Sequence, residues 1–239
     1  MAFKLGKLAP QLDSRDLKFS SLMRRGVSIP DLYDFDVLHP GIPTPMYLND
    51  TYGDCVIAGR AHQTLRFELI EKGVLPKITD AEVEKEYFSE THGADSGLVV
   101  SQSLKRWRRH GWTAGGSNYK IRAYSRLDLY NRSQIKAAVY SDLGVGIGFE
   151  VPQSAIDQFD AGANWSVVPN DGGIQGGHYV FCYAYDSQSV KCVTWGRRVL
   201  MSWDFFDIYT DEIWAIFDAV DTVKRQAVLD VAPLTNIGG

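Results

Sequence analysis

Cys55 is the residue best suited to chemistry in this sequence, because it follows the polar turn Asn49-Asp-Thr-Tyr-Gly-Asp54 and opens a segment with helical periodicity. Apolar residues recur at every fourth position after it, at Ile57, Ala61, Leu65 and Leu69. This spacing predicts a helix that begins at Cys55 and ends before Gly73. Unpaired backbone N–H groups and the positive end of the helix dipole favour a thiolate nucleophile at such a position. The alternative is that Cys55 is a small buried apolar residue.

His178 is the candidate base for that thiol. It opens the apolar segment His178-Tyr-Val-Phe-Cys-Tyr-Ala-Tyr185, which is predicted to be a central strand. Glycines precede it, Gly177 being the last, and they keep the approach to the imidazole open. An imidazole beside a thiol can act first as general base and then as general acid. A histidine that opens a strand can also be a buried structural residue, so both interpretations are kept.

The composition argues against several classes of function. The chain has 239 residues, 45% of them hydrophobic, which is enough for a sizeable core. Its formal net charge of -4 argues against nucleic acid and anionic membranes as partners. Three cysteines are too few for a disulfide framework, and no stretch has the length and pattern of a signal sequence or a membrane span. We therefore expect a soluble protein of a reducing compartment, the cytoplasm.

We expect neither a metal nor another cofactor. The histidines His62, His92 and His110 show no metal-ligand spacing with cysteines or carboxylates. The glycine pairs at 172–173 and 176–177 lack the helix start and the lysine of a phosphate-binding loop.

Helical spacing dominates the first half of the chain and strand spacing the second. Thr79 and Glu82 have the spacing of a capping box and predict a helix that ends near Thr91; a further helix follows the loop ending at Gly97 and stops before Gly111. Strands are predicted at 119–124, 145–151, 178–185 and 190–195, with a short helix near 133–143 and one more strand or short helix within 203–217. Residues 145–151 are expected to have one buried face. This order indicates an α+β fold whose two halves meet at a cleft.

The predicted domain limits follow from these patterns. Residues 1–28 are expected to form an irregular N-terminal arm with one short helix, 29–221 the folded domain, and 222–239 a C-terminal tail. Within the domain, the helical half spans about 49–115 and the β half about 116–221.

The cysteine at a helix start, the histidine at a strand start and Trp195-Gly196 on the returning strand occur in the order that resembles the papain-like cysteine peptidases. Ser28-Ile-Pro-Asp-Leu-Tyr-Asp-Phe35 looks like the start of a mature domain of that family, and Gly53-Asp-Cys55 stands for its Gly-Ser-Cys turn. Val190-Lys-Cys-Val-Thr-Trp-Gly196 is similar to its Val-Lys-Asn-Ser-Trp-Gly. The resemblance covers most of the chain and implies a papain-like two-subdomain fold, in a divergent member of bacterial or bacteriophage type.

The resemblance also implies residue roles. Cys55 would be the nucleophile and His178 the base and then the acid, while Asn49 and the Cys55 backbone N–H would form the oxyanion hole. The indole of Trp195 would shield the imidazole. Contacts to a peptide or protein substrate are expected from Gly97, Trp195 and Gly177.

The sequence departs from the family pattern at three of these positions. Val193 stands where the family has the asparagine that orients the histidine, and valine cannot accept the His178 N–H. Thr194 can replace it if the strand carries a bulge; the alternatives are a backbone carbonyl, a water, Asp186 or Asp204. Asn49 is a shorter amide than the usual glutamine. Asp54 is expected to cap the helix, although its charge disfavours a thiolate at Cys55.

Two functions follow from this pattern. The first is a papain-like cysteine hydrolase that cleaves peptide or isopeptide bonds with a Cys55–His178 dyad. The second is a catalytically weak or inactive protein on the same fold, with a structural or binding role in a larger assembly such as a viral particle. Val193, and the short stretch of residues 1–28 ahead of the expected domain, favour the second. Localisation would then be virion-associated rather than cytoplasmic.

Overall fold

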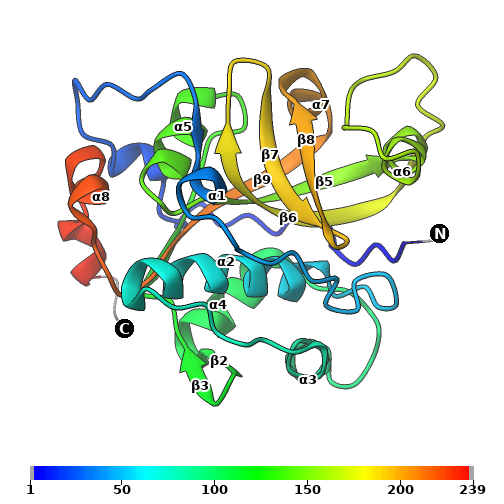
Figure 1. Cartoon of the computed structure of the whole chain (residues 1–239), viewed down its shortest axis with the longest axis horizontal. Helices are drawn as coiled ribbons and strands as arrows, with labels where there is room; N and C mark the ends of the chain where they lie inside the picture. Colours follow the sequence, from blue (N-terminus) through cyan, green and yellow to red (C-terminus); the bar gives the residue numbers. More distant parts are fainter. Residues whose placement is uncertain (1–2, 237–239) are drawn as a thin grey trace.

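An antiparallel sheet and a group of helices form two layers in the computed structural model, which describes residues 3–236 (Figure 1). The helical layer consists of α2 (Cys55–Lys72), α3 (Asp80–Glu90), α4 (Val100–His110) and the hairpin of β2 (Trp112–Ala114) and β3 (Ser117–Tyr119). The sequence predictions for the three helices are confirmed. They include the capping box of Thr79 and Glu82 and the glycine that follows α4.

The strands of the sheet lie in the order β4-β9-β5-β6-β7-β8, with β1 paired to β6, and all of these pairings are antiparallel. Their bounds are β1 (Tyr33–Asp34), β4 (Ala123–Arg126), β5 (Val145–Pro152), β6 (Ile174–Tyr185), β7 (Ser189–Thr194), β8 (Arg197–Ser202) and β9 (Thr210–Phe217). The predicted hairpin of residues 178–185 and 190–195 is confirmed as β6 and β7. Cys182 and Cys192 face each other in it as buried free thiols.

Short helices connect and cover the strands. They are η1 (Phe19–Ser21), α1 (Phe35–Leu38), α5 (Arg132–Tyr140), α6 (Gln153–Asp160), α7 (Trp203–Tyr209), α8 (Val223–Val228) and η2 (Ala232–Asn236). The predicted helix near 133–143 is confirmed as α5, whose N-cap Asn131 accepts a hydrogen bond from the backbone of Gln134.

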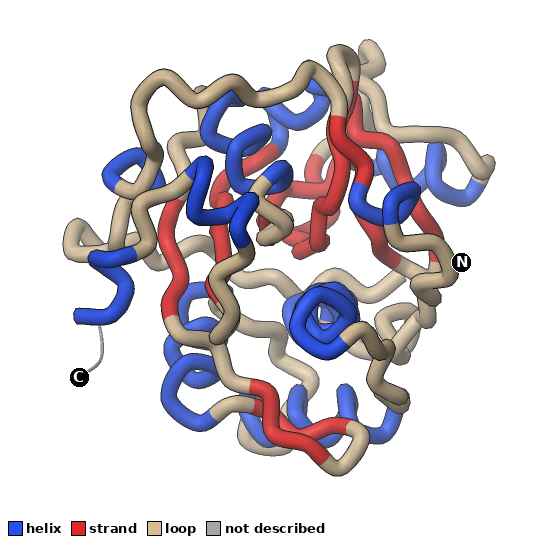
Figure 2. Tube along the Cα trace, turned by 60° about the vertical axis from the view of Figure 1, so that its left-hand side comes forward, coloured by secondary structure: helices blue, strands red, loops and turns tan. Residues whose placement is uncertain are grey.

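Helix α2 is the element of the helical layer that packs against the sheet, and Figure 2 looks nearly along its axis. Residues 55–68 are all buried, so the helix is enclosed around its whole circumference. Even its arginines are inside: Arg60 pairs with two carboxylates of α3, and Arg66 pairs with Asp36. Because a buried charge needs a partner, these ion pairs hold α2 in one position against the elements around it.

Several strand predictions need correction. Residues 119–124 do not form one strand, because the chain leaves β3 at Tyr119 and enters the sheet only at Ala123. Strand β5 is buried on both faces rather than one, with Glu150 as its one exposed residue. Residues 203–217 form both α7 and β9, and β9 lies inside the sheet instead of closing it. The sequence patterns do not predict β8.

Glycines allow β5 to be buried on both faces. A Cβ atom at Gly146 would lie 1.8 Å from the hydroxyl oxygen of Tyr179, and one at Gly148 would lie 2.3 Å from Cε of Lys7. The backbone of β5 is therefore in direct contact with a large side chain from β6 and with one from the N-terminal arm. The alternation of glycine with apolar residues in β5 reflects this close packing.

Much of the predicted C-terminal tail, residues 222–239, is folded onto the domain; residues 237–239 lie outside the described part. Arg225 of α8 is fully buried. Its guanidinium donates hydrogen bonds to the buried carboxylate of Asp218 and to the backbone carbonyl of Val220. A guanidinium in this position ties α8 to the end of β9.

We predict that Arg225→Ala lowers the free energy of unfolding by about 3–5 kcal/mol, because it leaves the Asp218 carboxylate buried without its cation. The matched control is Val223→Ala in the same helix, whose side chain is 86% exposed. That change should stay within about 0.5 kcal/mol of the wild type. Urea denaturation measures both, and equal effects would show that α8 is not part of the cooperative fold.

Candidate active site

Cys55 begins α2, as the sequence predicts, but it is fully buried. Burial raises the pKa of Cys55 to about 12, and backbone hydrogen bonds from Tyr179 and Gly6 lower it by a smaller amount. The side chain is therefore a neutral thiol at pH 7. Solvent exclusion, rather than the helix dipole, determines its protonation in this conformation.

His178 lies inside β6 rather than at its start, and its Nε2 is 2.7 Å from Oγ1 of Thr194 in β7. The strand register explains this contact. Phe181 pairs with Val193, so Val180 and Thr194 come opposite each other one step further along. His178 is then the diagonal neighbour of Thr194 on the same face, and Val193 belongs to the opposite face.

Thr194 thus takes the place of the partner that the imidazole needs. The sequence predicts this role only for a strand with a bulge, and the pairing of β6 with β7 carries a register shift between Cys182 and Ala184. Burial lowers the pKa of His178 to about 3, so its ring is neutral at pH 7. Within residues 3–236, no group hydrogen-bonds to Nδ1 of His178. With Nε2 held by Thr194, Nδ1 is the ring nitrogen left for proton transfer.

Trp195 lies in the turn between β7 and β8, not on the returning strand as the sequence suggests. Both turn residues have positive φ, 44° at Trp195 and 73° at Gly196, as a two-residue hairpin turn with the twist of its strands requires. The indole stacks on the His178 ring at 4.2 Å between centroids and at an interplanar angle of 21°. This contact shields one face of the imidazole.

Asn49 is 2% exposed, and its Nδ2 donates to Oδ1 of Asp54 at 3.0 Å. A side-chain amide carries two N–H groups, so one remains for an oxyanion. Asp54 does not cap α2 as expected: among the described residues its side chain accepts no capping hydrogen bond, because its backbone (φ -96°, ψ 14°) departs from the extended form that capping requires. Burial raises the pKa of Asp54 to about 8, so its carboxyl is largely neutral at pH 7; where it is ionised, its charge raises the pKa of Cys55, as the sequence predicts.

Three of the four predicted catalytic residues line one gap in the structure, and His178 is not among the residues that line it. One narrow interior gap is lined by Asn49, Cys55, Thr194 and Trp195, together with Tyr179. His178 joins this group through Thr194 and Trp195.

The N-terminal arm occupies the space between the two halves, where Figure 1 shows the first residues running between the sheet and the helices. On the β side, the backbone N–H of Lys7 donates to the carbonyl of Gly177 at 3.0 Å. On the helical side, Leu98 donates to the carbonyl of Gly6 at 2.8 Å and accepts from Leu8 at 2.9 Å. At Lys7 the arm therefore forms two single β-bridges, one antiparallel to Gly177 of β6 and one parallel to Leu98.

Glycines let the arm approach this closely. A Cβ at Gly6 would lie 1.7 Å from the carbonyl oxygen of Gly53, next to the Cys55 turn. A Cβ at Gly97 would lie 2.4 Å from the carbonyl oxygen of Gly6, and one at Gly177 would lie 2.4 Å from that of Lys7. The two glycines predicted to contact substrate thus contact the backbone of the arm.

Trp195, the third predicted substrate contact, also touches the arm. Phe3 stacks on it at 4.4 Å between ring centroids, with an interplanar angle of 21°. The indole is thereby enclosed between His178 and Phe3. The arm covers the site from the indole to the cysteine turn.

Sequence reasoning predicts an N-terminal arm but misses its place over the site and the acidic residues that hold it. The ammonium of Lys7 is 2.6 Å from Oδ2 of Asp211 and 3.6 Å from Oε1 of Glu212. Nothing in the local pattern of residues 3–8 marks them as a strand. The one available signal is Glu212, a charged residue that opens the buried apolar run of β9 and needs a cation.

The part of the chain that the structure describes contains no group of three or more His, Cys, Asp or Glu side chains that could hold a metal. No helix among residues 3–236 is long and apolar enough to cross a membrane.

The fold of this chain is similar to the folds of several solved cysteine proteases. Xylellain, a cysteine protease from Xylella fastidiosa, superposes with a TM-score of 0.73 at 16% identity, over 92% of this chain and 97% of its own. Procathepsin B S9 from Trypanosoma congolense gives 0.63 at 14% identity, over 91% and 87%. The Carica candamarcensis cysteine protease CMS1MS2, solved in complex with E-64, gives 0.59 at 14%, over 80% and 99%. No protein-family model and no curated protein matches the sequence.

We predict that Thr194→Val lowers the free energy of unfolding by about 1–3 kcal/mol, because it leaves Nε2 of His178 buried without a partner. Thr194→Ser is the control, since it keeps the hydroxyl and removes one methyl group, with an expected loss of about 1 kcal/mol or less. Urea denaturation compares the two variants. Equal losses would mean that the hydroxyl does not hold the imidazole.

A second prediction concerns pH. The pKa of Asp54 is raised from 3.8 to about 8 on folding, so the folded chain keeps a proton that the unfolded chain loses above pH 4. Its contribution to stability is therefore full below about pH 4 and declines as the pH rises to about 8. Relative to Asp54→Asn, which has the same shape and no titration, the wild type should lose stability across this range. A difference in unfolding free energy that does not change with pH would contradict the burial of a protonated Asp54.

Proposed function

We propose that this chain, whose fold is papain-like, is a cysteine hydrolase that cleaves peptide or isopeptide bonds, and that its N-terminal arm holds it in a latent form. The observation that carries the proposal is the arm itself. An extended peptide backbone already crosses Cys55 and is hydrogen-bonded to the segments on both sides, Leu98 and Gly177. The site therefore has the shape and the hydrogen-bonding groups to bind a peptide chain.

The residues supply each step of the reaction. Once the arm leaves and water enters, Nδ1 of His178 takes the proton of Cys55, and the thiolate attacks the carbonyl carbon of the substrate. The second N–H of Asn49 and the backbone N–H of Cys55 stabilise the oxyanion. His178 then gives its proton to the leaving amine, which leaves a thioester on Cys55. Water, deprotonated by His178, hydrolyses the thioester and restores the thiol.

Val193 does not exclude this chemistry, because the neighbouring Thr194 provides the contact that the usual asparagine would make. A hydroxyl is a weaker partner for an imidazolium than an amide oxygen, which predicts slow turnover. Changing the group that orients the base of a catalytic triad reduces the rate by about 10²- to 10⁴-fold and leaves the mechanism in place. A slow, specialised hydrolase fits these residues better than a general digestive one.

The alternative is a binding or structural protein on the same fold. The burial of Cys55, which raises its pKa to about 12, favours it as long as the arm stays in place. The two functions differ in whether displacement of the arm yields a reactive thiolate.

The test is alkylation of Cys55 by iodoacetamide, followed by mass spectrometry of the Cys55 peptide in the full-length chain. Gly6→Ala places a methyl group on the Gly53 carbonyl and should displace the arm. We predict that Cys55 reacts at least about a hundredfold faster at pH 8 in Gly6→Ala than in the wild type, because a hydrated thiol has a pKa near 8.5 or below.

Adding His178→Ala to Gly6→Ala should remove most of the remaining reactivity at pH 6, where only an ion pair keeps the thiolate. Hydrolysis of a quenched peptide library by Gly6→Ala, with Gly6→Ala/Cys55→Ala as the blank, then tests turnover. A thiol that stays inert, or that reacts without dependence on His178, would refute the hydrolase. Faster alkylation of Cys55 in Gly6→Ala without any hydrolysis of the peptide library would leave the binding protein as the function.

A further inference from the structure

Lys7 places its side chain in a closed pocket of the β half. The side chain is 1% exposed, although lysine normally keeps its ammonium in water. Its stem passes over Gly148 of β5, and its Nζ lies 2.6 Å from Oδ2 of Asp211 and 3.6 Å from Oε1 of Glu212. These two carboxylates, with the backbone of Gly148, form what we call the acidic pocket.

Glu212 makes this pocket selective for a cation. Its side chain is fully buried, and its Oε2 accepts a hydrogen bond from the indole N–H of Trp214 at 2.7 Å. In the described chain, neither Oε1 of Glu212 nor Oδ1 of Asp211 has a hydrogen-bond partner. Without Lys7, the buried carboxylate of Glu212 would keep only the indole donor, beside the partly exposed carboxylate of Asp211, which is unfavourable unless another cation enters.

Gly148 gives the pocket its depth. A Cβ there would lie 2.3 Å from Cε of Lys7 and 2.7 Å from Cγ of Glu212. Both neighbours are side chains rather than backbone, so the glycine provides space for a long unbranched stem between β5 and the carboxylates. A larger residue at this position would close the pocket.

The residue that fills the acidic pocket is hydrogen-bonded to the neighbour of His178 in the chain. The backbone N–H of Lys7 donates to the carbonyl of Gly177, which directly precedes His178. Any peptide residue that makes this hydrogen bond in place of Lys7 brings its side chain to the mouth of the acidic pocket.

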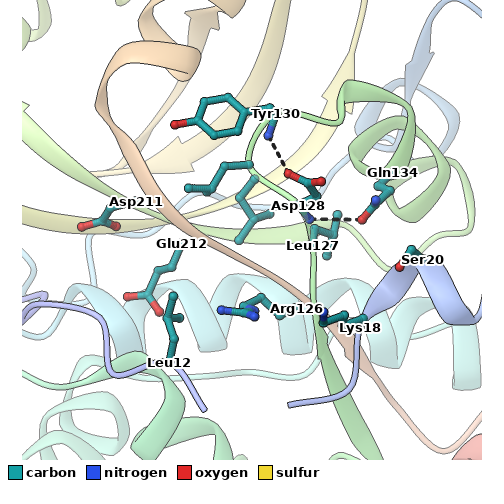
Figure 3. A pocket seen from close by; sticks show the side chains of 12 residues that line it. Leu12, Lys18, Ser20, Arg126, Leu127, Asp128, Tyr130, Gln134, Asp211 and Glu212 are labelled. Atoms are coloured by element: carbon teal, nitrogen blue, oxygen red, sulfur yellow. Dashed lines mark hydrogen bonds between the residues drawn. The ribbon is translucent and has the colours of Figure 1, made fainter. Parts of the chain in front are cut away.

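The two carboxylates of the acidic pocket also border a larger cavity. Asp211 and Glu212 line a cavity of about 410 Å³ between the arm and strands β4 and β9, shown in Figure 3. Lys18 and Arg126 line the same cavity, so its charges are mixed.

We propose that, when the arm is displaced, the acidic pocket binds a lysine or arginine side chain of the peptide substrate, so that the enzyme selects peptides with a basic residue at this position. This inference rests on the proposed function, because the bound peptide is a substrate only if the chain is a hydrolase. The pocket itself is defined by Lys7, Asp211, Glu212 and Gly148, and its binding preference can be measured without any hydrolysis.

The experiment uses the full-length Gly6→Ala chain and fluorescent peptides with the sequence of residues 3–10, Phe-Lys-Leu-Gly-Lys-Leu-Ala-Pro. The residue corresponding to Lys7 is lysine, arginine or norleucine, which has the same stem without the charge. Fluorescence anisotropy should show the lysine and arginine peptides binding at least about tenfold more tightly than the norleucine peptide, as expected for charge-assisted hydrogen bonds in a buried site.

Asp211→Asn/Glu212→Gln in the same chain should abolish this preference. The control is Asp204→Asn/Asp207→Asn, which removes two exposed carboxylates from α7 and should leave the preference unchanged. If Gly6→Ala does not fold cooperatively, the full-length Lys7→Met chain, in which the arm lacks its ammonium, takes its place.

Equal affinity for all three peptides, a preference that survives Asp211→Asn/Glu212→Gln, or no binding of any peptide would overturn the proposal. Because no peptide bond needs to be broken, a charge preference without hydrolysis would support the pocket while refuting the hydrolase. Hydrolysis without a charge preference would support the hydrolase while refuting the pocket.

Discussion

The backbone hydrogen bonds of Gly6, Lys7 and Leu8 are the interaction on which the state of the site depends. They join the helical half to the β half across Cys55, and they exclude water from the cysteine and the histidine together. Exclusion of water raises the pKa of the thiol to about 12 and lowers that of the imidazole to about 3, so both groups are neutral. The same residues that could form an ion pair are thereby kept from forming one.

Buried charges stabilise this arrangement from both sides. Within α2, Arg60 and Arg66 meet carboxylates and fix the helix that carries the cysteine. In the β half, Glu212 is ion-paired with an ammonium that belongs to the arm. Since removing one partner of a buried pair is strongly unfavourable, the arm leaves readily only when something replaces Lys7. A substrate that brings its own cation would compete with the arm for the pocket.

Local patterns in the sequence predict the parts of the site that depend on neighbours along the chain. The helix that starts at Cys55 follows from its apolar spacing, and the central strand around His178 follows from its apolar run. The role of Thr194 needs the register between β6 and β7, which local patterns leave open. The contact of Lys7 with Glu212 joins segments about 200 residues apart, and no period or motif in either segment encodes it. For this reason the fold is largely predictable and the occupied site is not.

The most direct test is the titration of Cys55 itself. Thiolate absorbance is followed against pH in the wild type and in Gly6→Ala. The absorbance of the same two chains carrying Cys55→Ser is subtracted, which removes the contributions of the other cysteines and of the tyrosines. The account predicts that Cys55 titrates at about 12 in the wild type and below its ordinary value of about 8.5 once the arm is displaced. If Cys55 ionises at the same pH in both chains, the arm does not control the thiol and the account is wrong.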